Sequence, residues 1–357
     1  MRVRPVLQAD WVRLRDSLPA IVQIGDASVA AFLLAQVLLQ QSAPLIAAII
    51  PITSLGFVGD ARPIRVLETA IAMTLGISLA EALVLGLGQT VWSFALALIL
   101  TLALARFVAA KAAFSIAAAV QCTLVMLSPT PPGGAFIRSV DALIGGVVAI
   151  LATAILPRNP WGAAVRAGRR LLRTHVEVFE QAAAALHAAD SDAAAAALAH
   201  ARSTTALVEE WRDSVSSGRS IAAVSPWFWR KRSEFARLTS MVEPLDLATR
   251  GLRVLARRAE YLVSLGAPQP ELSGMLERIA RAVRVLELSV SDLTERPVAR
   301  NELLEVAKHL DSATLLGADA SFYQSNVVHA ARPYVTDALV ATGLSLDDAR
   351  AALSPIE

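Results

Sequence analysis

The uneven distribution of charge along the chain limits its possible folds more than any other feature. Residues 17–157 contain 10 charged side chains in 141 positions (7%), whereas residues 158–357 contain 48 in 200 (24%). A soluble domain carries about 25% charged residues. The sequence therefore predicts a basic leader over 1–18, a transmembrane domain over 19–157 and a water-facing domain over 158–357.

Six apolar stretches subdivide the predicted membrane domain, and each is close to the roughly 20 residues that span a bilayer. They are Pro19–Leu39, Ser42–Val58, Val66–Leu85, Gln89–Ala105, Ala109–Leu127 and Val140–Leu156. The segment ends on the side of the N-terminus hold nine lysines and arginines, and the opposite side holds only Arg138. By the positive-inside rule, we expect both termini to be cytoplasmic.

After Pro157 the pattern changes to amphipathic helices, and no strand periodicity competes with them. Asn159 and Pro160 provide an N-cap followed by proline at the first helical position. Further helix starts are predicted at Pro226, Pro244, Pro270 and Pro297, with a helix break at Pro333. The chain is thus predicted to be all-α, a six-helix transmembrane bundle followed by a cytoplasmic helical bundle.

Several functional classes are disfavoured by motifs that the sequence lacks. The single cysteine, Cys122, excludes a disulfide framework and a cysteine-based metal cluster. No glycine is followed by lysine, so there is no phosphate-binding loop, and none of the five histidines is followed four residues later by a ligand-type residue. The sequence also has no long run of basic residues of the kind that binds nucleic acid. We expect neither an enzyme nor a cofactor or metal site, and no nucleic-acid partner.

Polar groups inside the apolar stretches are the main functional candidates, because each costs about 2.5–3.5 kcal/mol at the centre of the membrane. Asp26 lies two turns into the first stretch, and Gln121 lies in the middle of the fifth. Glu81 and Asp141 are near stretch ends, where a carboxylate can simply reach the membrane surface. Thr53, close to the helix-interrupting Pro51, completes a candidate polar path; a simple kink at this proline is the alternative.

Two local groups of charge flank the predicted spans. Arg62, Arg65 and Glu68 lie at the cytoplasmic start of the third stretch, where Arg65 and Glu68 can pair at i and i+3. They could form an anion-attracting mouth or serve as a positive-inside anchor. Arg138 and Asp141 form a second predicted i, i+3 pair at the outer start of the sixth stretch.

Small residues and aromatic residues predict two kinds of packing. Rows of small side chains allow helices to approach closely in lipid, and they recur every four residues at Ala72, Gly76 and Ala80 and at Gly145, Ala149 and Thr153. The run Pro226–Arg232 combines two tryptophans with three cations. Such a run is typical of a membrane interface, and the buried start of a cytoplasmic helix is the alternative.

Several of these motifs together resemble the FUSC family, the fusaric acid resistance and aromatic acid exporter group. The resemblance rests on the run Pro44–Ile50, on Arg62, Arg65, Glu68 and Gly76, on Gln121, on Arg138, Asp141 and Gly145, and on the runs Leu245–Arg250 and Arg253–Arg257. Many members have two six-span repeats, whereas this chain has one, so the resemblance implies a homodimer. The layout is also similar to that of plant aluminium-activated malate transporters.

The resemblance implies a secondary transporter in the plasma membrane that exports small organic anions, such as aromatic carboxylic acids. Its residues would be Arg62, Arg65, Glu68, Gln121, Asp26, Thr53, Arg138 and Asp141. Asp26 or Glu68 would carry a proton if transport is proton-coupled. The alternatives are a dimeric anion channel, or a scaffold that recruits a partner through its helical domain. The expected partners are an organic anion, membrane lipid and a second copy of the chain.

Overall fold

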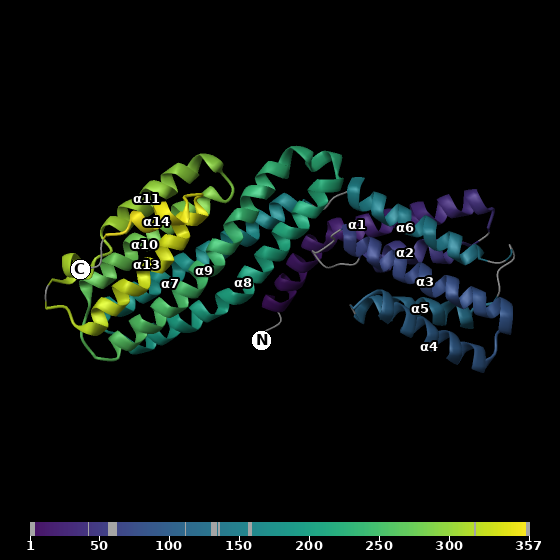
Figure 1. The fold of residues 1–357 in the computed structure, drawn as a ribbon, viewed down its shortest axis with the longest axis horizontal. Helices are drawn as coiled ribbons and strands as arrows, with labels where there is room; N and C mark the ends of the chain where they lie inside the picture. The colour runs from purple at the N-terminus through teal and green to yellow at the C-terminus, as the bar shows by residue number, and fades with distance from the viewer. Residues whose placement is uncertain are drawn as a thin grey trace. The chain divides into compact units, whose positions relative to one another are not determined.

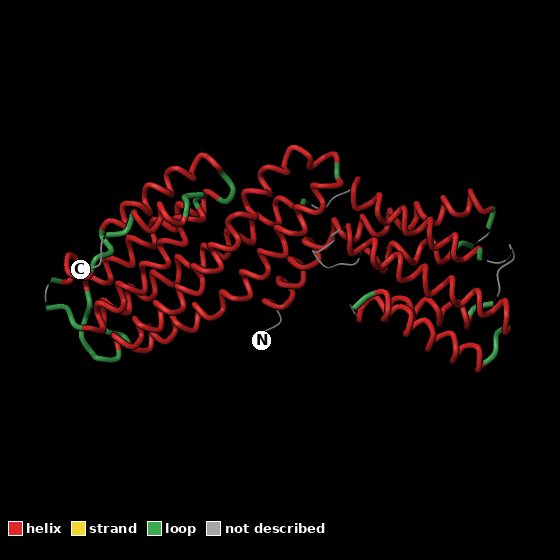
Figure 2. Tube along the Cα trace, in the orientation of Figure 1, coloured by secondary structure: helices red, strands yellow, loops and turns green. Residues whose placement is uncertain are grey.

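The computed structural model describes residues 4–41, 43–55, 63–110, 112–129, 134, 136–155, 159–317 and 319–354. Helices make up nearly all of these residues, and none of the described residues lies in a strand (Figure 2). The predicted all-α fold class is therefore confirmed.

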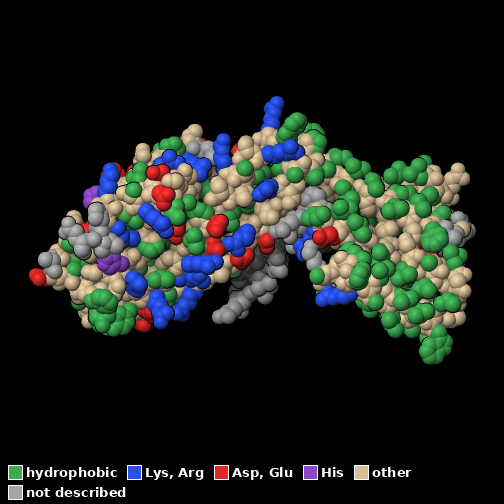
Figure 3. All heavy atoms as spheres, in the orientation of Figure 1, with side chains coloured by type: hydrophobic (Ala, Val, Ile, Leu, Met, Phe, Trp, Pro, Cys, Tyr) green, Lys and Arg blue, Asp and Glu red, His purple; other side chains and the backbone are tan. Residues whose placement is uncertain are grey.

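The chain divides into two compact units, and its helices are labelled in Figure 1. The first unit comprises Met1–Arg158 and Ser220–Arg230, and the second comprises Asn159–Arg219 and Lys231–Glu357. Apolar side chains cover the visible surface of the first unit, whereas charged side chains are spread over the second (Figure 3). The contrast is the one expected of a lipid-facing and a water-facing unit.

The first unit is built from six apolar helices. They are α1 (Arg4–Leu39), α2 (Leu45–Leu55), α3 (Pro63–Leu87), α4 (Val91–Val108), α5 (Ala112–Leu127) and α6 (Ile137–Ile155). α3 packs mainly against α5 and α6, and α2 packs against α6 and α1. Because α3 also packs against α4 and α2, it forms the centre of the unit.

Four segments of the described helices are long and apolar enough to cross a membrane. They are Ser17–Leu39, Ile64–Leu87, Val91–Val108 and Ile137–Ile155. α2 has only 11 residues and α5 only 16, so these two helices are shorter than the predicted spans. Helix α1 begins at Arg4, within the predicted basic leader, and continues through Pro19. The loss of one backbone donor at this proline did not end the helix.

Close helix packing follows the rows of small residues. A Cβ atom on Gly76 of α3 would lie 2.1 Å from the carbonyl oxygen of Ala118 on α5. A Cβ atom on Gly145 of α6 would lie 2.6 Å from the carbonyl oxygen of Ala47 on α2. Backbone is in contact with backbone at both crossings, as small-residue packing in lipid requires.

The second unit is a bundle of longer amphipathic helices. They are α7 (Pro160–Ala188), α8 (Ser191–Val224), η1 (Pro226–Lys231), α9 (Arg232–Val263), α10 (Pro270–Ser289), η2 (Leu293–Glu295), α11 (Arg296–Lys308), α12 (Ser312–Leu316), α13 (Phe322–Ala341) and α14 (Leu346–Ala351). The last residues of α8 and most of η1 belong to the first unit. α7 packs chiefly against α10, and α13 against α9.

Three of the prolines differ from their predicted roles. Pro244 lies inside α9 and Pro333 inside α13, although the first was predicted to start a helix and the second to break one. Pro226 starts a 3-10 helix rather than an α-helix. Burial of the apolar faces on both sides of Pro244 and Pro333 outweighs the loss of one backbone hydrogen bond at each.

A buried histidine joins three helices in the core of the second unit. His175 of α7 is fully buried, and its Nδ1 lies 3.0 Å from the hydroxyl of Tyr334 on α13. Its Nε2 lies 3.0 Å from the hydroxyl of Thr249 on α9. Burial lowers the pKa of His175 to about 3. The imidazole is therefore neutral in the folded protein at physiological pH.

Because the His175 imidazole is buried and neutral, we expect the protein to lose stability against unfolding in acid. The unfolded chain protonates His175 below about pH 6.5, while the folded chain resists protonation until about pH 3, so its stabilising contribution decreases as the pH falls between these values. At pH 5 the loss is about 2 kcal/mol. Asp337, whose pKa burial raises to about 6 despite Arg350, acts in the opposite direction. Unfolding of wild type and His175→Gln at pH 7 and pH 5 isolates the histidine, because the variant should lack this part of the decrease. An equal decrease in both proteins would contradict the prediction.

Candidate functional site

A cluster of buried polar side chains lies where α3 ends and α6 begins. The Glu81 carboxylate of α3 accepts the backbone N–H groups of Arg138 and Ser139, both at 3.1 Å. It also accepts the Ser139 hydroxyl at 2.6 Å, and Ser78 donates to Ser139 at 2.9 Å. Glu81 thus satisfies the free N–H groups at the start of α6 with a negative charge, which the helix dipole favours there.

The Arg138 guanidinium caps the C-terminal end of the neighbouring helix α5. Its Nη1 donates to the carbonyl of Val125 at 3.0 Å, and its Nη2 donates to the carbonyls of Ser128, at 3.3 Å, and Pro129. These carbonyls lie in and just after the last turn of α5, where helix carbonyls have no partner within the helix. Arg138 is therefore a cationic C-terminal cap for α5.

Asp141 does not pair with Arg138 as predicted. The Asp141 side chain is buried at 2% exposure, and its Oδ1 accepts the Nε2 amide of Gln41 at 3.2 Å. The arginine instead uses its donors on the α5 carbonyls. The physical reason is that the end of α5 presents several unsatisfied acceptors, which a guanidinium matches better than one carboxylate three residues away.

Glu81 and Asp141 lie inside the unit, whereas the simplest interpretation of the sequence was that they reach the membrane surface. Both are buried, at 8% and 2% exposure. Glu81 was left out of the predicted site, although its position offered a signal. It lies near the end of one apolar stretch and Arg138 near the start of another on the same side, so a carboxylate there can cap the neighbouring helix.

The residues of the predicted cytoplasmic mouth lie partly outside the described chain. Arg62 is outside the described residues. Arg65 is exposed near the start of α3, and Glu68 is half-buried one turn later. The two residues share one helix end, and their pairing stays a prediction.

The other predicted path residues lie in different surroundings. Asp26 is on the exposed face of α1 and does not point into the unit. The Thr53 hydroxyl donates to the carbonyl of Ile49 on its own helix at 2.9 Å and lies 3.2 Å from the sulfur of Met73. The structure therefore does not bring Asp26 and Thr53 into a common polar site with Arg138 and Asp141.

Gln121 is the most deeply buried of the predicted residues. It is 1% exposed on α5, and its Oε1 atom has no hydrogen-bond partner among the described residues. The hydroxyl of Ser115 on α5 is also buried without a partner among the described residues. Because an unpaired buried polar atom costs about 1–3 kcal/mol, these side chains would gain from a water or a polar ligand.

A groove of about 630 Å³ follows α3 and α6 on the first unit. Its polar groups include Thr74 and Ser78, and the remaining wall is apolar, with Leu67, Ile71 and Leu143 among its side chains. Asp26, Gln121, Arg138 and Asp141 are not among the residues that line it. Ser78, which donates to Ser139, is the residue that the groove shares with the buried polar cluster.

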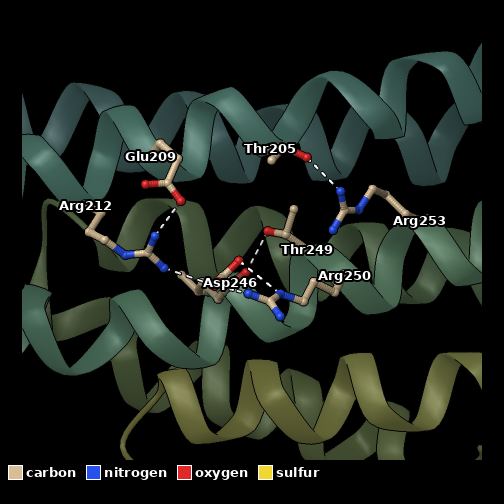
Figure 4. Close-up of polar contacts among 8 residues, drawn as sticks. Thr205, Glu209, Arg212, Asp246, Thr249, Arg250 and Arg253 are labelled. Carbon is tan, nitrogen blue, oxygen red and sulfur yellow. Dashed lines mark hydrogen bonds and ion pairs between the residues drawn. The ribbon is translucent and has the colours of Figure 1, made fainter.

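The motif Leu245–Arg250 of the second unit carries a network of ion pairs (Figure 4). The Asp246 carboxylate forms ion pairs with the guanidinium groups of Arg212 on α8, at 3.0 Å, and Arg250, at 2.9 Å. Arg212 also forms an ion pair with Glu209. Burial would raise the pKa of the Asp246 carboxyl, but the hydrogen bonds from Arg250 and Arg212 lower it below its usual value. The arrangement ties α8 to α9 and gives the motif a structural role.

The aromatic and cationic run is exposed. Trp227 and Trp229 are 75% and 67% exposed, and the hydroxyl of Ser225 donates to the carbonyl of Ala154 near the end of α6 at 2.8 Å. The run therefore starts at the end of a membrane-capable helix. Its contact with lipid stays a prediction.

Comparison with known proteins supports the membrane assignment. A protein of Corynebacterium glutamicum, named as uncharacterized, is 29% identical over 353 residues, which cover 96% of this chain and 90% of the relative. Residues 29–152 match the family described as fusaric acid resistance protein-like, and this match indicates membrane transport or efflux. The matched segment extends from the first third of α1 almost to the end of α6. Over residues 29–152, the membrane unit of this chain is therefore similar to the fusaric acid resistance protein-like family.

Proposed function

We propose that this protein is a secondary transporter that exports small organic anions, in particular aromatic carboxylic acids, across the plasma membrane. The observation that carries the proposal is the set of buried polar and charged side chains inside an apolar bundle of a transport-associated family. Ionisable residues in such bundles are kept for substrate or ion pathways.

In the proposed path, Arg65 attracts the anion at the cytoplasmic mouth and Gln121 offers an amide in the interior. Arg138 and Asp141 stand at the outer end. The short helices α2 and α5 are proposed to cross the membrane together with the four longer helices, which gives six spans in all. Glu68 is the proposed proton carrier in preference to Asp26, because Glu68 is half-buried and Asp26 is exposed. Both termini are proposed to be cytoplasmic, and a second copy supplies the other half of the transporter.

Two other functions compete with this one. An anion channel would use the same cationic mouth without proton coupling. A scaffold would use the large helical unit to recruit a partner, and the tightly packed surroundings of Gln121 favour this alternative. Against the scaffold stand the buried polar atoms that lack a partner, since a purely structural core has no need of them.

Uptake of radiolabelled p-hydroxybenzoate into proteoliposomes tests the proposal. We expect an imposed proton gradient to stimulate uptake, and Arg65→Ala to reduce it about tenfold or more through loss of a charged contact with the anion. Arg230→Ala is the matched control, because it removes an exposed arginine of the same unit that lies outside the proposed path. The control should transport like the wild type.

The outcomes separate the three functions. Uptake that follows voltage but ignores the proton gradient identifies the channel. Absence of uptake by monodisperse wild-type protein, with a transporting homologue as positive control, rejects transport of aromatic acids and favours the scaffold. Equal loss in Arg65→Ala and Arg230→Ala would remove Arg65 from the path.

A further inference from the structure

Arg296 and Arg300 of the second unit bind the end of α13, and Arg237 is near enough for its charge to lower the pKa of Arg296. No carboxylate among the described residues forms an ion pair with any of the three. Arg296 and Arg300 come from α11, and Arg237 comes from α9. The Nη2 of Arg296 donates to the carbonyl of Ala341 at 3.3 Å, whereas Arg300 donates to the Thr342 carbonyl at 2.7 Å and to its hydroxyl at 3.2 Å. Backbone and hydroxyl oxygens are thus their acceptors.

Two of the guanidinium groups converge on one point beyond the helix end. A Cβ atom on Gly343 would lie 2.8 Å from Nη2 of Arg296 and 3.7 Å from Nη2 of Arg300. Gly343 has a φ of +87°, so glycine is favoured there and leaves this space without a side chain. The two positive charges therefore face the same small volume.

The donors of this group are not all used. The Nε atom of Arg296 is buried and has no hydrogen-bond partner. The guanidinium of Arg237 is exposed and makes no hydrogen bond or ion pair with a described residue. Burial, and then the charges of Arg300 and Arg237, lower the pKa of Arg296. Like charges are thus concentrated where donors remain free.

Capping of α13 explains only part of this arrangement. The end of a helix carries about half a negative charge, which accounts for one arginine at most. It accounts for the bonds to Ala341 and Thr342, but not for the buried Nε of Arg296 or for the position of Arg237. Three guanidinium groups with spare donors match an anion that has several oxygens and more than one charge.

We propose that Arg237, Arg296 and Arg300 form a binding site for a doubly charged oxyanion of the phosphate-monoester class. The ligand would accept the free donors on the side of the guanidinium groups that faces away from the α13 carbonyls. Free phosphate esters of the cytoplasm and the headgroup of phosphatidic acid share this chemistry. The site goes beyond the proposed transport and does not depend on it.

Thermal unfolding of the full-length protein in neutral detergent tests the site, with inorganic phosphate compared with chloride at constant ionic strength. A ligand at about 100 times its Kd is expected to raise the Tm of the wild type by about 5 °C or more. Arg237→Gln should lose most of this shift, and its phosphate Kd by calorimetry should rise about tenfold or more. Without phosphate the variant should be at least as stable as the wild type, because a repulsive charge is removed and no contact is broken.

Arg202→Gln is the matched control, since Arg202 is an exposed arginine of α8 whose side chain has no partner among the described residues. It should keep the full response to phosphate. The proposal is overturned if phosphate acts on the wild type no more than chloride does, or if Arg237→Gln keeps the shift. Nanodiscs with phosphatidic acid identify the source: a phosphate response abolished there indicates the lipid headgroup, and a response that persists indicates a soluble ester.

Discussion

Replacing Gly76 with alanine is expected to destabilise the membrane unit more than any other single methyl group added to it. The new Cβ would lie 2.1 Å from the carbonyl oxygen of Ala118, 2.8 Å from its carbonyl carbon and 3.0 Å from its Cα. Because all three atoms belong to the backbone of α5, no side-chain rotation relieves the clash, and α3 and α5 must separate. We expect a loss of about 3 kcal/mol, at the upper end of the overpacking range, measured as a lower unfolding midpoint in detergent.

Gly25→Ala is the matched control, because a Cβ on this glycine of α1 meets no atom within 4 Å. Alanine is also the better helix former by about 1 kcal/mol, so this variant should be as stable as the wild type or more stable. Gly145→Ala should behave like Gly76→Ala, since its Cβ would lie 2.6 Å from the carbonyl oxygen of Ala47. A Gly76→Ala protein that unfolds at the wild-type midpoint would show that α3 and α5 are not in contact there.

Removal of the Glu81 side chain is the second change with a large expected effect. Glu81→Ala leaves the N–H groups of Arg138 and Ser139 without their acceptor, together with the Ser139 hydroxyl, in a buried apolar setting. It also removes the negative charge from the start of α6. Since each unsatisfied buried donor costs about 1–3 kcal/mol, the total loss is expected to be about 3 kcal/mol or more.

Two further variants distinguish capping from charge alone. Glu81→Gln keeps one acceptor oxygen and should lose less stability than Glu81→Ala. Glu68→Ala removes a half-buried carboxylate from the same helix and should be milder, because Glu68 lies at the start of α3 and away from the start of α6. If Glu81→Gln and Glu81→Ala lose the same stability, the oxygen contacts do not support α6.

The apolar and polar halves of the chain were predictable because burial in lipid and exposure to water impose opposite compositions. Helix lengths were less predictable. Ala43 and Pro44 before α2 and Ala109 and Ala110 before α5 are not helical, although the apolar stretches include them. Hydropathy records the preference of side chains for lipid, and it does not record where backbone hydrogen bonding stops.

The polar cluster was only partly predictable for a related reason. Sequence spacing identified Arg138 and Asp141, but it suggested that they bind each other, because only neighbours along a helix can be paired from spacing. Their actual partners, the α5 carbonyls and Gln41, come from segments brought near by the fold. Glu81 was missed because it binds the N–H groups of a helix that begins more than fifty residues later in the sequence.

The assignment of residues 220–230 to the membrane unit has a consequence for how this protein can be divided. The chain leaves that unit after Arg158, returns at Ser220 and leaves again at Lys231, so the two units are interleaved along the sequence. A truncation at residue 158 would remove Trp227 and Trp229 from the membrane unit. The C-terminal fragment would then expose these two tryptophans to water. Recombination cannot exchange the helical unit at a single junction, and the pair of units is expected to be inherited together.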